Sequence, residues 1–169
     1  MTPQQQTMTE KEAHLTARDM EHQTTARVLK AFPADQASFK PHPTSMTALE
    51  TAWMMTAMQH GIAEGLAGAE LPMEGPPASP KTWEELIRFD EKTHAELMRK
   101  VGAMSDEVLA GTIRVPMAKN RSEEYRRIDV LNYMLRAAVH HRGQLSVYLR
   151  MVGGKVPSIY GPSGDEKWD

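Results

Sequence analysis

The sequence predicts an all-α protein built as a four-helix bundle, with a long crossover connection between its second and third helices. Four segments of about 20 to 30 residues repeat apolar side chains at the spacing of an amphipathic helix. Proline- and glycine-rich segments separate them, and the one after the second helix, LPMEGPPASP, is too long for a tight turn. Four amphipathic helices with one long connection most economically form a bundle with a crossover.

The first two helices are expected at about 9–32 and 45–68. Pro33 ends the first helix, because proline lacks an amide hydrogen and clashes with the preceding helical turn. Three prolines then exclude a helix from the loop PADQASFKPHPTS. The inward stripes are formed by Leu15, His22, Leu29 and Phe32 in the first helix, and by Leu49, Trp53, Thr56, His60 and Ala63 in the second.

The other two helices are expected from Thr82 to Met104 and from about Ser122 to Val152. Thr82 and Glu85 match a capping box, and Ser105 begins a short capped turn. The segment at 111–125 is expected to be irregular, with a brief extended piece at Thr112–Val115, so strand content is close to nil. The inward stripes hold Trp83, Ile87, His94, Leu97 and Val101, and then Val130, Met134, Ala137, Ala138, His141, Leu145 and Tyr148.

Length and composition limit the function classes. A chain of 169 residues predicts one domain over 1–169, with a short flexible N-terminus at 1–8 and a C-terminal tail at 153–169. A net charge of −2 argues against a nucleic-acid partner, because domains that bind nucleic acids usually carry an excess of basic residues. The absence of cysteine excludes thiol nucleophiles, cysteine-ligated zinc and disulfides. Neither a signal peptide nor a long apolar run is present, so we expect a cytoplasmic protein without membrane contact.

Four of the seven histidines lie on the inward stripe of a different helix: His22, His60, His94 and His141. Imidazoles that converge inside a bundle can form a metal site. A single histidine on an apolar face is more often a hydrogen-bonded core residue, and the sequence does not fix the depth of each ring, so both interpretations stay open. His14 and His42 lie near the ends of apolar structure and are expected to be solvated.

The segment Val139–Glu166, VHHRGQLSVYLRMVGGKVPSIYGPSGDE, closely resembles the C-terminal signature of the DinB/YfiT-like family of bacterial four-helix bundles. Phe39–Pro43, Pro80–Trp83 and Met104–Glu107 are similar to that family as well, so the resemblance covers about 21–166. It implies a divalent ion, often nickel or zinc, held by one histidine of the second helix and a His-x-x-x-His pair of the last. The family includes metal-dependent transferases of low-molecular-weight thiols, and its members often dimerise.

Only one of the three family ligands is present in this chain. The second histidine of the pair, directly before Arg-Gly-Gln, falls on His141, whereas its partner falls on Ala137 and the second-helix ligand falls on Met54. His60 follows Met54 by six positions, a rotation of about 240° that keeps it from the missing place. Glu50 lies four residues before Met54 and adds one carboxylate to the same face of the second helix. These five residues are the candidates for a metal position or pocket, and no catalytic residue is assigned.

The resemblance and the missing ligands together predict a DinB-like protein with a degenerate metal site and no cofactor. Such a protein would be a non-catalytic or stress-associated binding module, and we expect a homodimer formed through the methionine-rich second helix (Met54, Met55 and Met58). A small-molecule ligand held by His141 and neighbouring polar groups is one alternative. The other is a metal-dependent hydrolase or low-molecular-weight-thiol S-transferase that binds nickel or zinc through an altered ligand set.

Without a metal, the residues after His141 are expected to hold the tail. Arg142 would pair with a carboxylate or with C-terminal carbonyl groups, and Gln144 would bond the returning tail. Tyr148 and Tyr160 would clamp the tail by stacking and through their hydroxyl groups.

Overall fold

The structure is a computed structural model that describes residues 8–72 and 77–168. The segment 1–7, most of the expected flexible N-terminus, lies outside the described residues. Four long helices form the bundle: α1 (Glu10–Ala31), α2 (Ala48–Gly65), α3 (Trp83–Ala103) and α5 (Arg127–Met151). The all-α bundle expected from the sequence is therefore confirmed.

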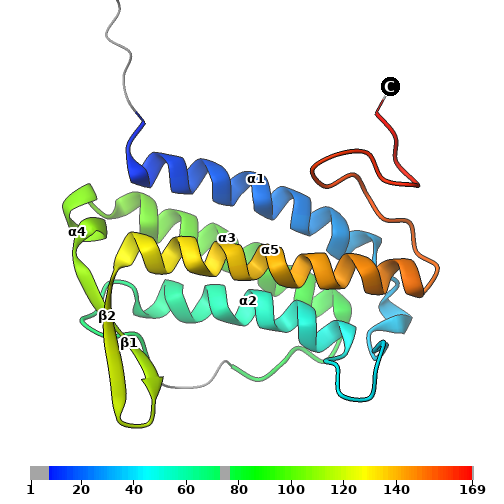
Figure 1. The fold of residues 1–169 in the computed structure, drawn as a ribbon, viewed down its shortest axis with the longest axis horizontal. Coiled ribbons are helices and arrows are strands. Elements are labelled where there is room, and N and C mark those ends of the chain that lie inside the picture. The colour runs from blue at the N-terminus through cyan, green and yellow to red at the C-terminus, as the bar shows by residue number, and fades with distance from the viewer. Residues whose placement is uncertain (1–7, 73–76, 169) are drawn as a thin grey trace, which may run out of the picture.

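The direction of each helix explains the long connection. Figure 1 shows α1 and α5 running one way along the bundle and α2 and α3 running the other way. Because α2 and α3 are parallel neighbours, the chain must return along the length of the bundle between them. None of the helices within the described residues is long and apolar enough to cross a membrane.

Side-chain caps set where the long helices begin. Thr9 and Thr47 each accept a bond from the backbone amide three residues later, and Glu12 and Glu50 bond back to complete two capping boxes. Thr82 caps α3 in the same way through its hydroxyl oxygen, but the carboxylate of Glu85 accepts from the amide of Lys81, 2.9 Å away. The expected reciprocal box at α3 is therefore only half formed.

The segment at 112–126 is a β-hairpin. The extended piece expected at Thr112–Val115 forms its first strand, whereas the expectation of irregular chain up to 125, with almost no strand, is wrong. Strand β1 (Thr112–Ala118) pairs antiparallel with β2 (Arg121–Arg126), and Figure 1 shows the hairpin projecting from one end of the bundle. The side chain of Ile113 is 1% exposed, so the first strand is anchored in the core. The last helix consequently begins at 127 and not at about 122.

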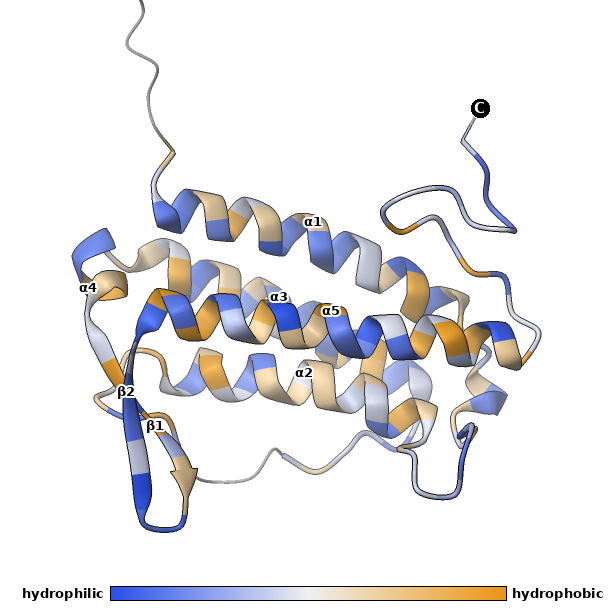
Figure 2. Ribbon diagram, in the orientation of Figure 1, coloured by the Kyte–Doolittle hydropathy of each residue, from blue (hydrophilic) through white to orange (hydrophobic). Residues whose placement is uncertain are grey.

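Two apolar clusters fill the bundle, one toward each end. One surrounds Trp83, whose indole nitrogen donates to the carbonyl oxygen of Leu29 at 2.8 Å. The other surrounds Leu97 and Leu131 and includes residues of the hairpin and of the short helix α4 (Asp106–Ala110). Polar residues lie between the clusters on every long helix, and hydrophilic residues interrupt the hydrophobic ones along α5 in Figure 2.

The tail is held by a buried guanidinium group. The side chain of Arg142 is 1% exposed and donates to the carboxylate of Glu21 at 2.6 Å and to the hydroxyl oxygen of Tyr160 at 2.6 Å. That hydroxyl donates in turn to Glu21 at 2.8 Å. The expected carboxylate partner of Arg142 and the expected role of Tyr160 are confirmed.

Two other expectations about the tail are wrong. Gln144 bonds His141 of its own helix at 2.9 Å, because the two residues are three apart on the same face. Tyr148 packs edge-on against Phe39, with ring centroids 5.8 Å apart, on the loop before α2.

Replacing Glu21 by alanine should strongly destabilise the fold, because it leaves Arg142 charged, buried and without its carboxylate. We expect the free energy of unfolding to fall by about 3 kcal/mol in urea titrations followed by circular dichroism. The matched control is Glu91→Ala, which removes a carboxylate from an exposed pair with Lys30 and should change that free energy by less than about 1 kcal/mol. Equal losses in both variants would contradict the role given to Glu21.

Candidate functional site

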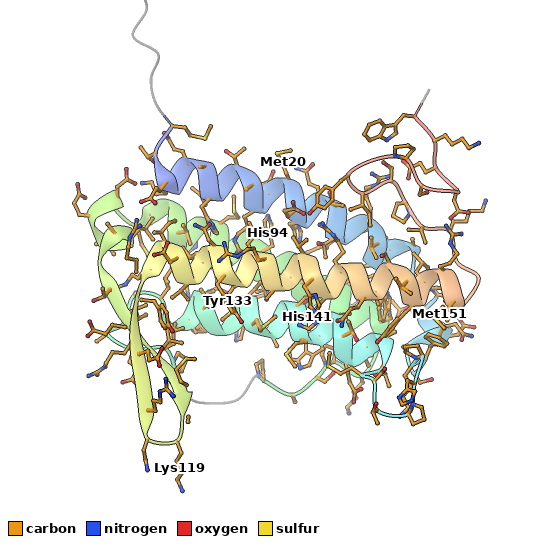
Figure 3. All side chains as sticks on the ribbon, viewed as in Figure 1. Met20, His94, Lys119, Tyr133, His141 and Met151 are labelled. Carbon is orange, nitrogen blue, oxygen red and sulfur yellow. The ribbon has the colours of Figure 1, made fainter. Side chains whose placement is uncertain are left out.

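The residues at the family ligand positions lie on α2 and α5. The thioether of Met54 is 38% exposed on the outer side of α2, and Ala137 and His141 are half-buried on α5. The Nδ1 atom of His141 lies 2.9 Å from Oε1 of Gln144, so this ring nitrogen is the donor when the amide oxygen accepts. Figure 3 shows His141 on the side of α5 toward α2, away from His94.

A pocket of about 480 Å³ lies beside Met54, between α2, the start of the crossover and α5. Met54 and His60 both line it, whereas Ala137, Glu50 and His141 do not. Glu50 is instead the capping carboxylate of α2. The ring of His60 packs against Phe89 of α3, with centroids 5.3 Å apart. Of the five candidates, the structure thus brings only two to one cavity.

The interior of the bundle holds a buried polar layer. It contains His14, which was expected from the sequence to be solvated. The side chain of His14 is 2% exposed, and its Nδ1 lies 2.7 Å from the amide oxygen of Asn132 on α5. Its Nε2 accepts from Nε of Arg18 at 3.0 Å. The expectation fails because His14 and Arg18 are four residues apart and share the inward face of α1.

Arg18 joins three helices inside this layer. Its guanidinium is 1% exposed and donates to the side-chain oxygen of Gln59 on α2 at 3.1 Å and to the carbonyl oxygen of Leu131 on α5 at 3.2 Å. Burial lowers the pKa of Arg18 to about 10, so the group stays charged at neutral pH.

Burial keeps the ring of His14 neutral. Burial is the main cause that lowers the pKa of His14 to about 4, and the charge of Arg18 lowers it further, against the bond to Asn132. A second proton would occupy Nε2, which already faces the N–H of Arg18. His14 is therefore fixed as a donor to α5 and an acceptor within α1.

His22 and His94 meet in the same layer as a stacked pair. Their ring centroids are 3.7 Å apart and their planes differ by 1°. The Nε2 of His22 lies 3.1 Å from buried Asp90, which also accepts from the hydroxyl of Thr56 at 2.8 Å. The Nε2 of His94 lies 3.3 Å from Asp19, and its buried Nδ1 has no partner among the described residues.

The four inward histidines therefore do not form one site. His22 and His94 face each other, whereas His60 packs on Phe89 and His141 bonds Gln144. Parallel stacked rings cannot aim their lone pairs at one point. Across 8–72 and 77–168, no three His, Asp or Glu side chains lie close enough to share a metal ion. The sequence did contain one sign of this buried polar cluster. Asp90 and His94 are four residues apart, so they share the inward face of α3.

The stability of the protein should fall as the pH is lowered from 6.5 to 4. In that range the unfolded chain binds a proton at His14 and the folded protein does not, so protons favour unfolding and stability rises with pH. Burial also lowers the pKa of His94, which acts with the same sign. The protonation of His14 alone should make the free energy of unfolding about 3 kcal/mol lower at pH 4 than at pH 6.5.

Urea titrations at a series of pH values measure this slope. His14→Gln should flatten it, because glutamine retains a donor and an acceptor but does not titrate. The control His42→Gln alters an exposed ring before α2 and should leave the slope as in the unchanged protein. An unaltered slope in His14→Gln would contradict the assignment.

Comparison with known proteins agrees with the fold. The DinB family model matches residues 6–168. A DinB-like protein from Bacillus cereus ATCC 10987 is 19% identical, with a TM-score of 0.72 over 88% of this chain and 97% of its own. A DinB-like protein from Bacillus subtilis is 17% identical, with a TM-score of 0.68 over 85% of this chain and 94% of its own. At such identities these two structures show a shared fold alone.

A search of curated proteins gives no match. The family match covers nearly the whole length and includes the motifs around His141 that resemble the family. The chain belongs to the DinB family.

Proposed function

We propose that this member of the DinB family is a non-catalytic binding module whose inherited divalent-metal site has lost two of its three ligands. The observation that carries the proposal is the set of side chains at the three ligand positions. Met54 offers a soft thioether, Ala137 offers a methyl group, and His141 offers the one imidazole among the three positions. Nickel and zinc at hydrolytic sites prefer imidazole and carboxylate ligands, so this donor set does not fit them.

The loss of ligands also removes the chemistry that the metal would supply. A catalytic zinc lowers the pKa of its bound water through three protein ligands, and a single imidazole holds a divalent ion weakly. In the polar layer, Asp90 is 2% exposed and bonded to His22 and Thr56. These contacts support a structural role for the layer.

The pocket beside Met54 supports a binding role. Its volume of about 480 Å³ lies within the range of small-molecule sites, and its lining is mostly apolar. His141 is not part of the lining, so the proposed ligand site is this pocket and not the surroundings of His141.

The proposal predicts that the purified protein contains far less than one nickel, zinc or manganese ion per chain. The variant Met54→His with Ala137→His should gain zinc binding, because it restores the donors that the family uses. Elemental analysis and zinc titration measure both results. A control with Met20→His and Met151→His adds two histidines at exposed positions and should gain no comparable site.

Near-stoichiometric nickel, zinc or manganese in the unchanged protein would contradict the proposal. It would favour the alternative of a hydrolase or thiol S-transferase with an altered ligand set.

The homodimer remains a proposal, with a different surface from the one expected. Met55 is fully buried and cannot contact a partner. Exposed apolar side chains instead lie on one side of α5, at Tyr133, Val147 and Met151, two of which Figure 3 labels. Val147→Glu should then shift the sedimenting species from dimer to monomer, whereas Met20→Glu on α1 should not. A monomer in the unchanged protein would exclude the dimer.

A further inference from the structure

Three methionines line the pocket of about 480 Å³. Met54 and Met58 are four residues apart on α2, so their side chains lie one turn apart on one face of the helix. Met134 joins them from α5, which packs against α2. Gly61 also lines the pocket, and an added Cβ there would meet no atom within 4 Å, so the pocket is open at this glycine.

The other polar groups of the pocket are already engaged. The carboxylate of Glu64 accepts from Lys100 at 3.0 Å, and the ring of His60 packs on Phe89. The bond from Lys100 lowers the pKa of Glu64, so the carboxylate is ionised and its charge is paired with the ammonium group. Oxygen donors for a hard ion are therefore scarce among the described lining residues.

Thioether sulfur is a soft, uncharged and polarisable donor. Soft ligands of this kind select Cu(I) among the biological metals and bind calcium, magnesium and zinc poorly. The chain has no cysteine, so no thiolate competes with methionine for a soft ion. The donor type and the open space of the pocket point to the same class of ligand.

We infer that this pocket is a soft monovalent-metal site, in which the sulfur atoms of Met54, Met58 and Met134 coordinate Cu(I) or its chemical analogue Ag(I). The inference rests on the proposed function, because it gives the binding module a ligand class. It requires no redox step, since the ion enters and leaves as the monovalent cation.

The test is a titration of the full chain with Cu(I) under anaerobic conditions against a chromophoric Cu(I) chelator, repeated with Ag(I) by calorimetry. We expect one ion per chain. Changing a residue that only hydrogen-bonds a metal ligand lowers metal affinity about tenfold or more. Met54→Leu and Met134→Leu each remove a proposed ligand, so each should lower the Cu(I) affinity by at least that factor. Leucine keeps nearly the same apolar volume and lacks the sulfur, so these variants separate coordination from packing.

Two controls exclude other binding sites. Met20→Leu removes an exposed methionine from α1, which Figure 3 shows on the opposite side of the bundle from α2, and should leave the affinity unchanged. His141→Gln removes the imidazole at the family position and should also leave it unchanged. Circular dichroism verifies that all variants fold.

The inference would be overturned if the protein failed to compete with the chelator for Cu(I). It would also be overturned if several ions bound per chain with affinities that Met54→Leu and Met134→Leu leave unchanged. If Cu(I), Ag(I) and zinc all fail to bind, the non-catalytic module without a divalent site still stands and only the metal class is refuted. Stoichiometric zinc in the unchanged protein would refute the proposed function itself.

Discussion

The buried guanidinium of Arg18 constrains the whole bundle. It is surrounded by helices, and each of its hydrogen bonds reaches a different partner: His14 on its own helix, Gln59 on α2 and a backbone carbonyl on α5. Asp90 adds the fourth helix through His22 and Thr56. A buried charge is tolerated only when its donors are satisfied, so sliding any helix by one turn would be expensive. Apolar contacts alone would discriminate far less between such registers.

The helices could be predicted from the sequence because their signals are local. Apolar spacing, the threonine caps and the ending at Pro33 all act within one helix, and the crossover follows from a long segment rich in proline. The hairpin could not be predicted in this way. Its second strand, RSEEYR, is polar, and its pairing depends on Ile113 being anchored beside Leu71 and Leu97 in a core formed by distant residues.

The candidate site was predictable only in part, for a related reason. Ala137 and His141 were found because their motif is continuous around His141, and Met54 was found from the separate segment TAWMM of the second helix. The pocket depends on which side of α2 remains uncovered and on where Met134 lies across from it, and both follow from packing. His14 was misplaced because its position near the start of α1 says nothing about Asn132, which is 118 residues away.

The arrangement of the first and last helices also affects the order of events during synthesis. Arg18 is translated early, yet its acceptor at Leu131 belongs to α5, which leaves the ribosome more than a hundred residues later. Until then the guanidinium has acceptors at His14 and Gln59 but lacks the one on α5. The hydrogen bonds that fix the register of α1 are therefore complete only after the last helix has been translated.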